Sequence, residues 1–294
     1  MSELAHPVQA PAAPLAFRTM PDVLGGRYCI ECLLGAGGMG TVYRARDLLA
    51  QQFGDPQPYV ALKVLSEAYD QSPDASALLF NEYALMRHLH HPNVLRHFSF
   101  DVDTAHQRVF VVMELLRGPT LDRLLCEHPL GLTWPALRDI ALPLLEAVVH
   151  AHGRGVLHGD IKPSNVLLSD DGVRLFDFGL GRAEAGTLDG LAHVSRNRVN
   201  AWTPGYAAPE ILEGAALTRA ADIYALGCVL YELASGKHPF NRMPATHARP
   251  KRPKNLPRHV WRGVRKALAP DPGKRCISAA QLHEALATKP GFWG

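Results

Sequence analysis

One short stretch constrains this chain more than any other, residues 156–165, which read Val-Leu-His-Gly-Asp-Ile-Lys-Pro-Ser-Asn. It places an aspartate, a lysine and an asparagine within six positions, as Asp160, Lys162 and Asn165. Such side chains can orient a hydroxyl, offset the charge of a phosphoryl group and hold a magnesium ion. Asp177 follows twelve residues after Asn165 and is a second candidate metal ligand. We therefore take this stretch as the centre around which the rest of the chain is organised.

The composition limits the class of protein. With 294 residues, 47% of them hydrophobic and 20% charged, the chain can build one large domain or two lobes with real cores. A net charge of +3 is too small to indicate nucleic-acid binding by the whole chain. Five scattered cysteines do not suggest a disulfide framework. Because we find neither a secretory signal nor an apolar run long enough to span a membrane, we expect a reduced, cytoplasmic compartment.

The first part of the chain is predicted to be rich in strands. Residues 1–21 read as a disordered leader rich in Ala and Pro. The predicted strands cover 27–34, 41–46, 59–65, 94–101 and 108–114. Residues 48–58 are predicted to form a loop, since they contain Gly54, Pro56 and Pro58. A helix is predicted to start at Ser72 as N-cap, with Pro73 at its first position.

This helix carries a carboxylate on its apolar face. Its apolar stripe comprises Leu78, Leu79, Leu85, Met86 and Leu89. Glu82 lies on the same stripe and needs a partner or a wet cleft, because burying a lone carboxylate is costly. In the strand before the helix, Lys63 shares a face with the small residue Ala61. We therefore predict an ion pair between Lys63 and Glu82.

The second part of the chain is predicted to be mainly helical. One helix runs from Thr133 to about His152, and Pro143 is expected to kink it. Residues 166–168 and 173–176 read as a short hairpin. Residues 220–234 are apolar on nearly every face, with Gly236 as C-cap, so this helix should be buried. The expected organisation is given by four ranges: a small lobe over 22–115, a hinge over 116–118, a larger lobe over 119–288 and a tail over 289–294.

A glycine-rich loop, Gly35-x-Gly37-x-x-Gly40, lies between two predicted strands. That context argues against a dinucleotide-binding turn and for a hairpin folded over nucleotide phosphates, which approach glycine amides closely. Each signal also has a plain structural explanation. A flexible hairpin can contain these glycines, a strand lysine often extends to solvent, and a loop Asp or Asn often caps a turn. Five such motifs in this order make coincidence implausible.

Together the motifs resemble those of bacterial eukaryotic-like (Hanks-type) serine/threonine protein kinases. The resemblance covers about residues 25–288 and rests on runs that include 34–47, His158-Gly159-Asp160, Asp177-Phe178-Gly179 and 202–210. It implies an α+β, two-lobe protein-kinase fold, with a small antiparallel-sheet N-lobe bearing one key helix and a larger, mainly helical C-lobe. It also implies transfer of the γ-phosphoryl group of ATP, with Mg²⁺, to Ser or Thr hydroxyls of protein substrates.

The same resemblance implies residue roles. Asp160 would be the catalytic base and Lys162 the cation facing the phosphate, while Lys63, braced by Glu82, would anchor the α and β phosphates. The implied magnesium ligands are Asn165 and Asp177. Thr203 lies in the implied substrate-docking loop. The implied nucleotide site comprises Leu34, Gly35, Ala36, Gly37, Gly38, Met39, Gly40, Thr41, Val42, Ala61, Lys63, Met113, Glu114, Leu116 and Leu167. The implied structural braces are Asp222 for the catalytic loop and Arg275 for Glu210.

One position departs from the family pattern. Where these kinases usually have His-Arg-Asp, this chain has Gly159 between His158 and Asp160. The usual arginine grips a phosphate on the activation loop, and glycine has no side chain to do so. We therefore hypothesise that activity does not require activation-loop phosphorylation, although three hydroxyl residues lie between Asp177 and Glu210. These are Thr187, Ser195 and Thr203.

Two alternatives remain open at this point. His-Gly-Asp also occurs in small-molecule kinases of the aminoglycoside and choline kinase type, but those families typically lack both the lysine found here at 162 and the Ala-Pro-Glu found at 208–210. An ATP-binding pseudokinase scaffold would be expected to lose Lys63, Asp160 or Asp177, and all three are present.

A basic run covers residues 249–266, with eight Lys or Arg and no acidic residue. It is either a solvated, proline-broken connection between helices or a docking surface for an acidic partner or an anionic lipid. Related bacterial kinases often continue into a membrane span and a sensor domain. The resemblance therefore allows either a cytoplasmic protein or the cytoplasmic domain of a longer, membrane-anchored one.

Overall fold

The computed structural model describes residues 20–37, 40–65, 73–188, 191, 203–242 and 250–288. Several positions singled out in the sequence lie outside the described residues: almost all of the leader, Gly38, Met39, Ser72, Ser195, Trp202, Arg249 and the tail 289–294.

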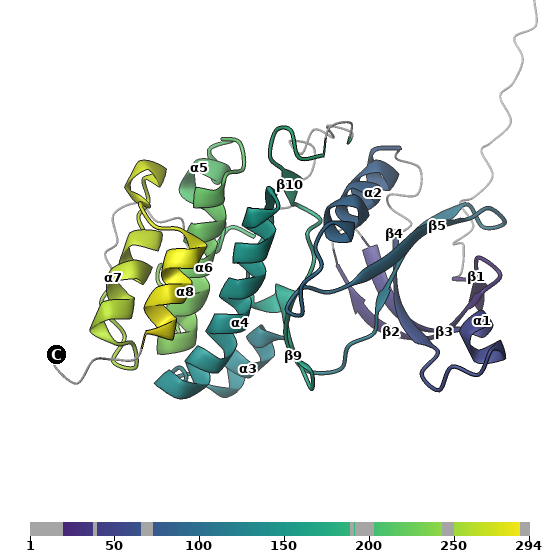
Figure 1. Ribbon diagram of the computed structural model, residues 1–294, viewed down its shortest axis with the longest axis horizontal. Coiled ribbons are helices and arrows are strands. Elements are labelled where there is room, and N and C mark those ends of the chain that lie inside the picture. The colour runs from purple at the N-terminus through teal and green to yellow at the C-terminus, as the bar shows by residue number, and fades with distance from the viewer. Residues whose placement is uncertain are drawn as a thin grey trace, which may run out of the picture.

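Six antiparallel strands form the sheet of the smaller lobe, on the right of Figure 1. Their order across the sheet is β1-β2-β3-β4-β6-β5. The strands are β1 (Val23–Leu24), β2 (Tyr28–Ala36), β3 (Gly40–Asp47), β4 (Tyr59–Leu65), β5 (His97–Asp103) and β6 (Arg108–Glu114). The predictions for 59–65 and 108–114 are confirmed residue for residue. The prediction for 94–101 starts too early, because Val94 bridges to Leu175 of the other lobe.

The prediction of a loop over 48–58 is wrong in its first half. The short helix α1 (Leu48–Gln52) begins directly after β3. Asp47 caps it, with its side chain accepting hydrogen bonds from the backbone N–H groups of Leu49 at 3.1 Å and Ala50 at 3.2 Å. An aspartate followed by good helix formers is a helix-start signal, which the later glycine and prolines outweighed in the sequence analysis.

Both faces of the sheet are packed. Helix α2 (Pro73–Arg87) lies against one face, where Ala75 and Leu79 contact Leu65 and Val111. The opposite face has its own buried cluster: Leu24, Tyr28, Ala45, Val60, Leu62, Val64, Phe110 and Val112. Strand alternation therefore sends every second residue of β4 away from α2 into this cluster. The residues between them, Ala61 and Lys63, are left to face the other lobe.

The larger lobe is helical. Its helices are α3 (Leu121–Glu127), α4 (Trp134–Gly153), α5 (Pro209–Leu212), α6 (Arg219–Ser235), α7 (Arg258–Ala267) and α8 (Ala279–Ala287). The predicted buried helix is confirmed as α6, where all residues from Ala221 to Leu230 are buried. Gly236 ends it in the left-handed conformation, at φ 69°. In α4, Thr133 precedes the helix as predicted but makes no side-chain cap hydrogen bond, and Pro143 lies inside it.

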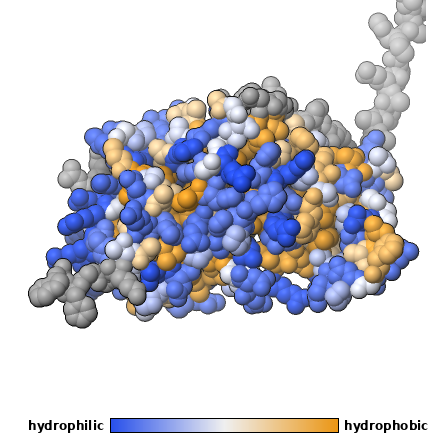
Figure 2. Space-filling model, viewed as in Figure 1, coloured by the Kyte–Doolittle hydropathy of each residue, from blue (hydrophilic) through white to orange (hydrophobic). Residues whose placement is uncertain are grey.

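Two small strand pairs lie where the lobes meet. The predicted hairpin is confirmed as β8 (Val166–Ser169) and β9 (Gly172–Leu175). The second pair joins β7 (Val156–Leu157) to β10 (Arg182–Ala183). Figure 2 shows a largely hydrophilic surface over the outer end of the helical lobe, where Figure 1 places α7. Within the described part of the chain, no helix combines the length and apolarity needed to cross a membrane.

Candidate active site

A cleft of about 1070 Å³ lies between the lobes. Residues proposed from the sequence supply much of its lining: Leu34, Gly35, Ala36, Gly37, Gly40, Val42, Ala61, Lys63, Glu82, Met113, Glu114, Leu116, Asp160, Lys162, Asn165, Leu167 and Asp177. Thr41 is not part of the lining, because alternation along β3 turns Val42 into the cleft and its neighbour to the other face.

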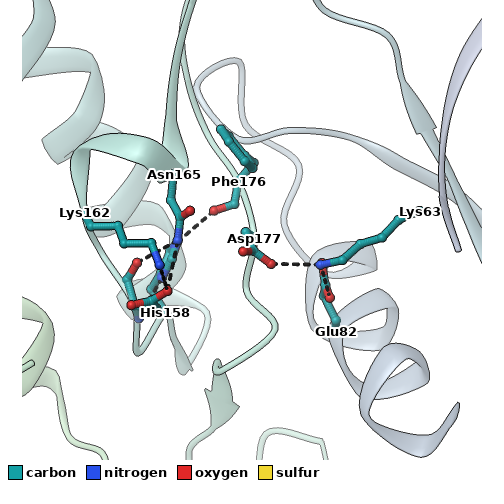
Figure 3. A network of polar contacts seen from close by, with 8 residues as sticks. Lys63, Glu82, His158, Lys162, Asn165, Phe176 and Asp177 are labelled. Atoms are coloured by element: carbon teal, nitrogen blue, oxygen red, sulfur yellow. Dashed lines mark hydrogen bonds and ion pairs between the residues drawn. The ribbon is translucent and has the colours of Figure 1, made fainter. Parts of the chain in front are cut away.

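Lys63 makes the ion pair predicted with Glu82. Its Nζ lies 2.8 Å from Oε1 and 2.7 Å from Oε2 of Glu82, and Glu82 is only 3% exposed. The same Nζ donates to Oδ1 of Asp177 at 2.8 Å, a contact that the sequence did not suggest. Figure 3 shows Asp177 between this pair and the group around Lys162. Lys63 therefore joins α2 of the small lobe to the metal-ligand candidate of the large one.

The charges of Lys63 and Asp177 stabilise each other, whereas burial raises the pKa of Glu82 despite its contact with Lys63. Burial alone would lower the pKa of Lys63, but the carboxylates of Asp177 and Glu82 raise it above its ordinary value. The ammonium of Lys63 in turn holds the pKa of Asp177 at about 2. Both groups are therefore charged at neutral pH, and the Asp177 side chain, 37% exposed, presents its carboxylate to the cleft.

In residues 156–165 the side chains of Asp160, Lys162 and Asn165 lie together. Nζ of Lys162 lies 2.6 Å from Oδ2 of Asp160 and donates to Oγ1 of Thr203 at 2.8 Å. Nδ2 of Asn165 donates to the carbonyl oxygen of Asp160 at 2.9 Å and to its Oδ2 at 3.3 Å. These two bonds assign the orientation of the Asn165 amide and leave Oδ1 without a donor among the described residues.

The environment of Asp160 suits a proton acceptor. Burial raises the pKa of its carboxyl group, and the neighbouring Lys162 opposes part of that rise. A carboxylate whose proton affinity is raised in this way accepts a proton more readily than a solvated one.

A buried aspartate of α6 holds the backbone of this loop. Oδ2 of Asp222 accepts a hydrogen bond from the backbone N–H of His158 at 2.9 Å, and Oδ1 accepts one from Gly159 at 2.8 Å. His152 of α4 approaches Oδ2 of Asp222 with its Nε2 at 2.9 Å. The brace expected from Asp222 is therefore confirmed.

His158 connects the catalytic loop to the segment before Asp177. Its Nδ1 accepts from the backbone N–H of Asp160 at 3.1 Å, and its Nε2 lies 3.0 Å from the carbonyl oxygen of Phe176. Burial lowers the pKa of His158, so the ring is neutral, with its proton on Nε2. The place of His158 two residues before the candidate base Asp160 is the only signal in the sequence that points to this role.

Gly159 adopts a conformation that few other residues can. Its φ is +80°, and a Cβ there would lie 2.6 Å from the carbonyl oxygen of Leu180 and 2.9 Å from Cδ2 of Leu217. The loop therefore passes too close to the segment after Asp177 to leave room for a side chain at this position.

The ion pair expected between Arg275 and Glu210 is also confirmed. Nη2 of Arg275 lies 2.7 Å from Oε2 of Glu210, and Nη1 lies 2.5 Å from Oε1. The Arg275 side chain is fully buried and also donates to the carbonyl oxygens of Ala220, Ala269 and Pro270. It thereby joins α5 to the first turn of α6.

The cleft has further lining that the sequence analysis did not identify: Leu95, His97, Leu115, Gly118, Thr120, Asp122, Arg123, Ser164, Phe176, Gly179 and Leu180. His97 is notable because its Nδ1 is buried with no hydrogen-bond partner in the described structure. It lies opposite Met113 in the ladder between β5 and β6. Alternation in β5 could not reveal it, because a register irregularity follows directly after it.

Comparison with known proteins gives a consistent picture. A family model described as the protein kinase domain matches residues 28–285. The serine/threonine-protein kinase PkaA of Streptomyces coelicolor is 34% identical over 279 residues, which are 90% of this chain and 50% of that protein. The DNA damage-responsive serine/threonine-protein kinase RqkA of Deinococcus radiodurans is 37% identical over 227 residues, covering 76% of this chain and 32% of that protein. The chain thus spans half or less of the length of these relatives.

Solved structures show the same architecture. The kinase domain of Mycobacterium tuberculosis PknI superposes with a TM-score of 0.68 at 25% identity, and the match covers 90% of this chain and 96% of that one. The expected two-lobe fold, with an antiparallel sheet in one lobe and helices in the other, is confirmed.

Proposed function

This chain belongs to the protein kinase domain family, and on that premise we propose that it transfers the γ-phosphoryl group of ATP to Ser or Thr hydroxyls of proteins. The observation that carries the proposal is the convergence of Asp160, Lys162 and Asn165 with the Lys63–Asp177 pair in one cleft. Both bacterial relatives are serine/threonine-protein kinases by name, which supports Ser or Thr of proteins as the acceptor class.

The cleft fits ATP with Mg²⁺. The carboxylate of Asp177 and Oδ1 of Asn165 are oxygen donors of the kind that Mg²⁺ prefers, and both residues line the cleft. Lys63 and the glycine loop supply a cation and backbone amides for phosphate oxygens, while Met113, Glu114 and Leu116 would flank the base. When bound, Mg²⁺–ATP supplies the phosphoryl group and part of its charge neutralisation.

The residues of the chain then act mainly by positioning. Asp160 orients the acceptor hydroxyl and takes its proton, which the burial of its carboxyl group favours. Lys162, held by Thr203, offsets negative charge on the transferring group. Lys63, held by Glu82, anchors the α and β phosphates.

The proposal is tested by incubating the full chain with γ-labelled ATP and Mg²⁺. We expect label on serine or threonine of a generic protein substrate, no label on a panel of aminoglycosides, choline and other small alcohols, and loss of transfer in Lys63→Met. Label on a small alcohol alone would favour the small-molecule kinase. A thermal shift with Mg²⁺–ATP but no label on any acceptor would favour an ATP-binding scaffold without catalysis.

We also propose that activity does not depend on activation-loop phosphorylation. Two observations support it: position 159 lacks a side chain, and its φ of +80° with the close approach of Leu180 leaves no room for one. Phosphatase-treated protein should retain most of its activity. Near-total loss that rephosphorylation restores would refute this part of the proposal.

The basic run 249–266 is proposed as a docking surface for an acidic partner or an anionic lipid. Its described cations are all exposed: Lys251, Arg252, Lys254, Arg258, Arg262, Arg265 and Lys266. No salt bridge compensates any of them within the described residues. Such uncompensated charge attracts anions at long range.

Charge reversal tests this surface. Arg249, Lys251 and Arg252 are changed to Glu, and binding to vesicles with and without phosphatidylserine and to acidic protein substrates is measured. Reversal of Arg154, Lys237 and Lys274 is the matched control, because it changes the net charge equally at exposed sites elsewhere. Equal effects of the two triple variants would leave only a solvated connection between helices.

We also propose that the chain lies in a reduced, cytoplasmic compartment. The observation that supports this proposal is that all five cysteines are free.

A further inference from the structure

The segment that follows Asp177 is held at its start by backbone hydrogen bonds to residues 155–157. Strand β10 pairs with β7, with Arg182 opposite Leu157 and Ala183 opposite Val156. The backbone N–H of Glu184 then donates to the carbonyl oxygen of Gly155 at 2.7 Å. The backbone of this segment, directly beside the catalytic loop, therefore continues the ladder up to Glu184.

The side chain of Glu184 makes the next contact. Nε of Arg219 donates to its Oε1 at 2.8 Å, and Nη2 donates to its Oε2 at 2.5 Å. Two parallel charge-assisted bonds of this kind fix orientation as well as distance. The Arg219 hydrogen bond lowers the pKa of Glu184, so the carboxylate is charged at neutral pH.

The first turn of α6 thus holds two segments at once. Asp222 binds the backbone N–H groups of His158 and Gly159, and Arg219, three residues earlier on the same helix, binds Glu184. The guanidinium of Arg219 and the carboxylate of Glu184 therefore form an ion pair beside the catalytic loop, in which position 159 has no arginine to make such a contact. The guanidinium comes from α6 and the anion is a carboxylate of the chain itself.

We propose that Arg219 and Glu184 are positioning residues whose ion pair holds the start of the activation segment, residues 177–210, without a phosphate. The carboxylate of Glu184 takes the place of a phosphate group, and Arg219 takes the place of an arginine at 159. This inference rests on the proposed kinase function and deepens its independence of phosphorylation.

The size of the effect follows from exposure. The side chains of Arg219 and Glu184 are 53% and 35% exposed, so solvent and salt screen the pair. Exposed pairs of this kind shift equilibria by about two- to fivefold. We therefore expect a graded loss of turnover from breaking the pair, and no loss of folding.

The experiment uses the full chain after phosphatase treatment, with a generic protein substrate. Arg219→Ala and Glu184→Ala should each lower kcat by about two- to fivefold and leave the KM for ATP unchanged. The charge-swapped protein, Arg219→Glu with Glu184→Arg, should regain most of the kcat that the single variants lose. Lys274→Ala is the matched control, because Lys274 forms an exposed pair with Asp271 at 3.6 Å and does not line the cleft. It should change nothing.

A second measurement does not depend on activity. Amide hydrogen exchange at residues 182–188 should be faster in both single variants, while the free energy of unfolding stays at the wild-type value. Single variants that match wild type in both kcat and exchange would overturn the proposal, as would a swapped protein no better than the single variants. Failure of the wild type to phosphorylate any protein would instead contradict the proposed function, and the exchange data would then still decide whether the pair positions the segment.

Discussion

At position 159 the absence of a side chain and the positive φ of +80° both belong to the close approach between this loop and Leu180. The sequence alone shows Gly159 only as the loss of an arginine that would bind a phosphate. The structure adds a steric reason, since a Cβ at 159 would lie 2.6 Å from the carbonyl oxygen of Leu180. The glycine therefore lets the catalytic loop and the activation segment pass close together, and regaining an arginine would require both to move.

Replacing this glycine should be costly. We expect Gly159→Ala to lower the free energy of unfolding by more than the ~1–2 kcal/mol of a left-handed alanine, because the contact with Leu180 adds to the backbone strain. Gly54→Ala is the control, since Gly54 has a similar φ of +83° with nothing within 4 Å of a built Cβ. Urea denaturation of the two variants compares them. Equal destabilisation would show that the close approach at 159 carries no cost.

Asp160 gives the second prediction at this scale. Asp160→Asn keeps the shape of the side chain but removes the proton acceptor, so kcat should fall by about 10²- to 10⁴-fold. Because Asp160 is not among the proposed phosphate or metal ligands, the dissociation constant for Mg²⁺–ATP should stay nearly unchanged. Steady-state kinetics and a nucleotide-binding titration measure the two quantities. Equal losses in both would contradict the role assigned to Asp160.

At the scale of elements, α6 does more than fill the core. Its apolar surface on all sides predicted burial correctly, and Ala221 to Leu230 are buried. Yet the helix also carries buried polar groups that hold neighbouring segments. Asp222 binds the backbone of His158 and Gly159, and Glu232 accepts a hydrogen bond from the hydroxyl of Tyr206 in the segment before α5. The same helix is thus both the core of the large lobe and the support of its loops.

The buried ion pair at the start of this helix should be important for stability. Glu210→Ala would leave the fully buried guanidinium of Arg275 without its carboxylate, at a cost of about 3–5 kcal/mol. The neighbouring Lys274→Ala removes a cation whose side chain is 77% exposed, and should cost close to nothing. Thermal and chemical unfolding measure both. A small effect of Glu210→Ala would mean that the carbonyl oxygens around Arg275 are sufficient to hold it.

At the scale of the whole molecule, a few contacts decide how the lobes meet. Nζ of Lys63 bridges Glu82 of α2 to Asp177 of the large lobe, and Val94 bridges to Leu175. His97 lies close to this junction. Burial, with a smaller contribution from the charge of Lys63, lowers the pKa of His97 to about 3, although the charge of Asp177 opposes the shift. The imidazole is therefore neutral in the folded protein.

The histidine makes the molecule sensitive to acid. The pKa of His97 is lower in the folded protein than in the unfolded chain, so between about pH 6.5 and 3 the unfolded chain binds more protons. Its contribution to stability is complete above pH 6.5 and falls with decreasing pH, by at most about 1.4 kcal/mol per pH unit. His97→Leu should flatten the decline in unfolding free energy between pH 7 and pH 5, whereas the exposed His128→Leu should not. Parallel declines in all three proteins would contradict this assignment.

Much of the site could be predicted because its chemistry is encoded locally. Phosphoryl chemistry needs particular residue types at short, fixed spacings, and Asp160, Lys162 and Asn165 lie within six positions. Helical and strand periodicity were enough to match Glu82 with Lys63 across 19 residues. One local signal points the wrong way: Gly54, Pro56 and Pro58 predict a loop over 48–58, although Asp47 is the N-cap of the helix α1.

The sequence by itself therefore determined which chemical groups this protein has, their order and the two-lobe arrangement of strands and helices. Only the tertiary structure decided two pairings over long distances: Asp177 with Lys63 across 114 residues, and Arg219 with Glu184 across 35. The physical reason is that periodicity reports which face a side chain occupies within its own element. The packing of whole elements against one another, which no local pattern specifies, sets which faces come together.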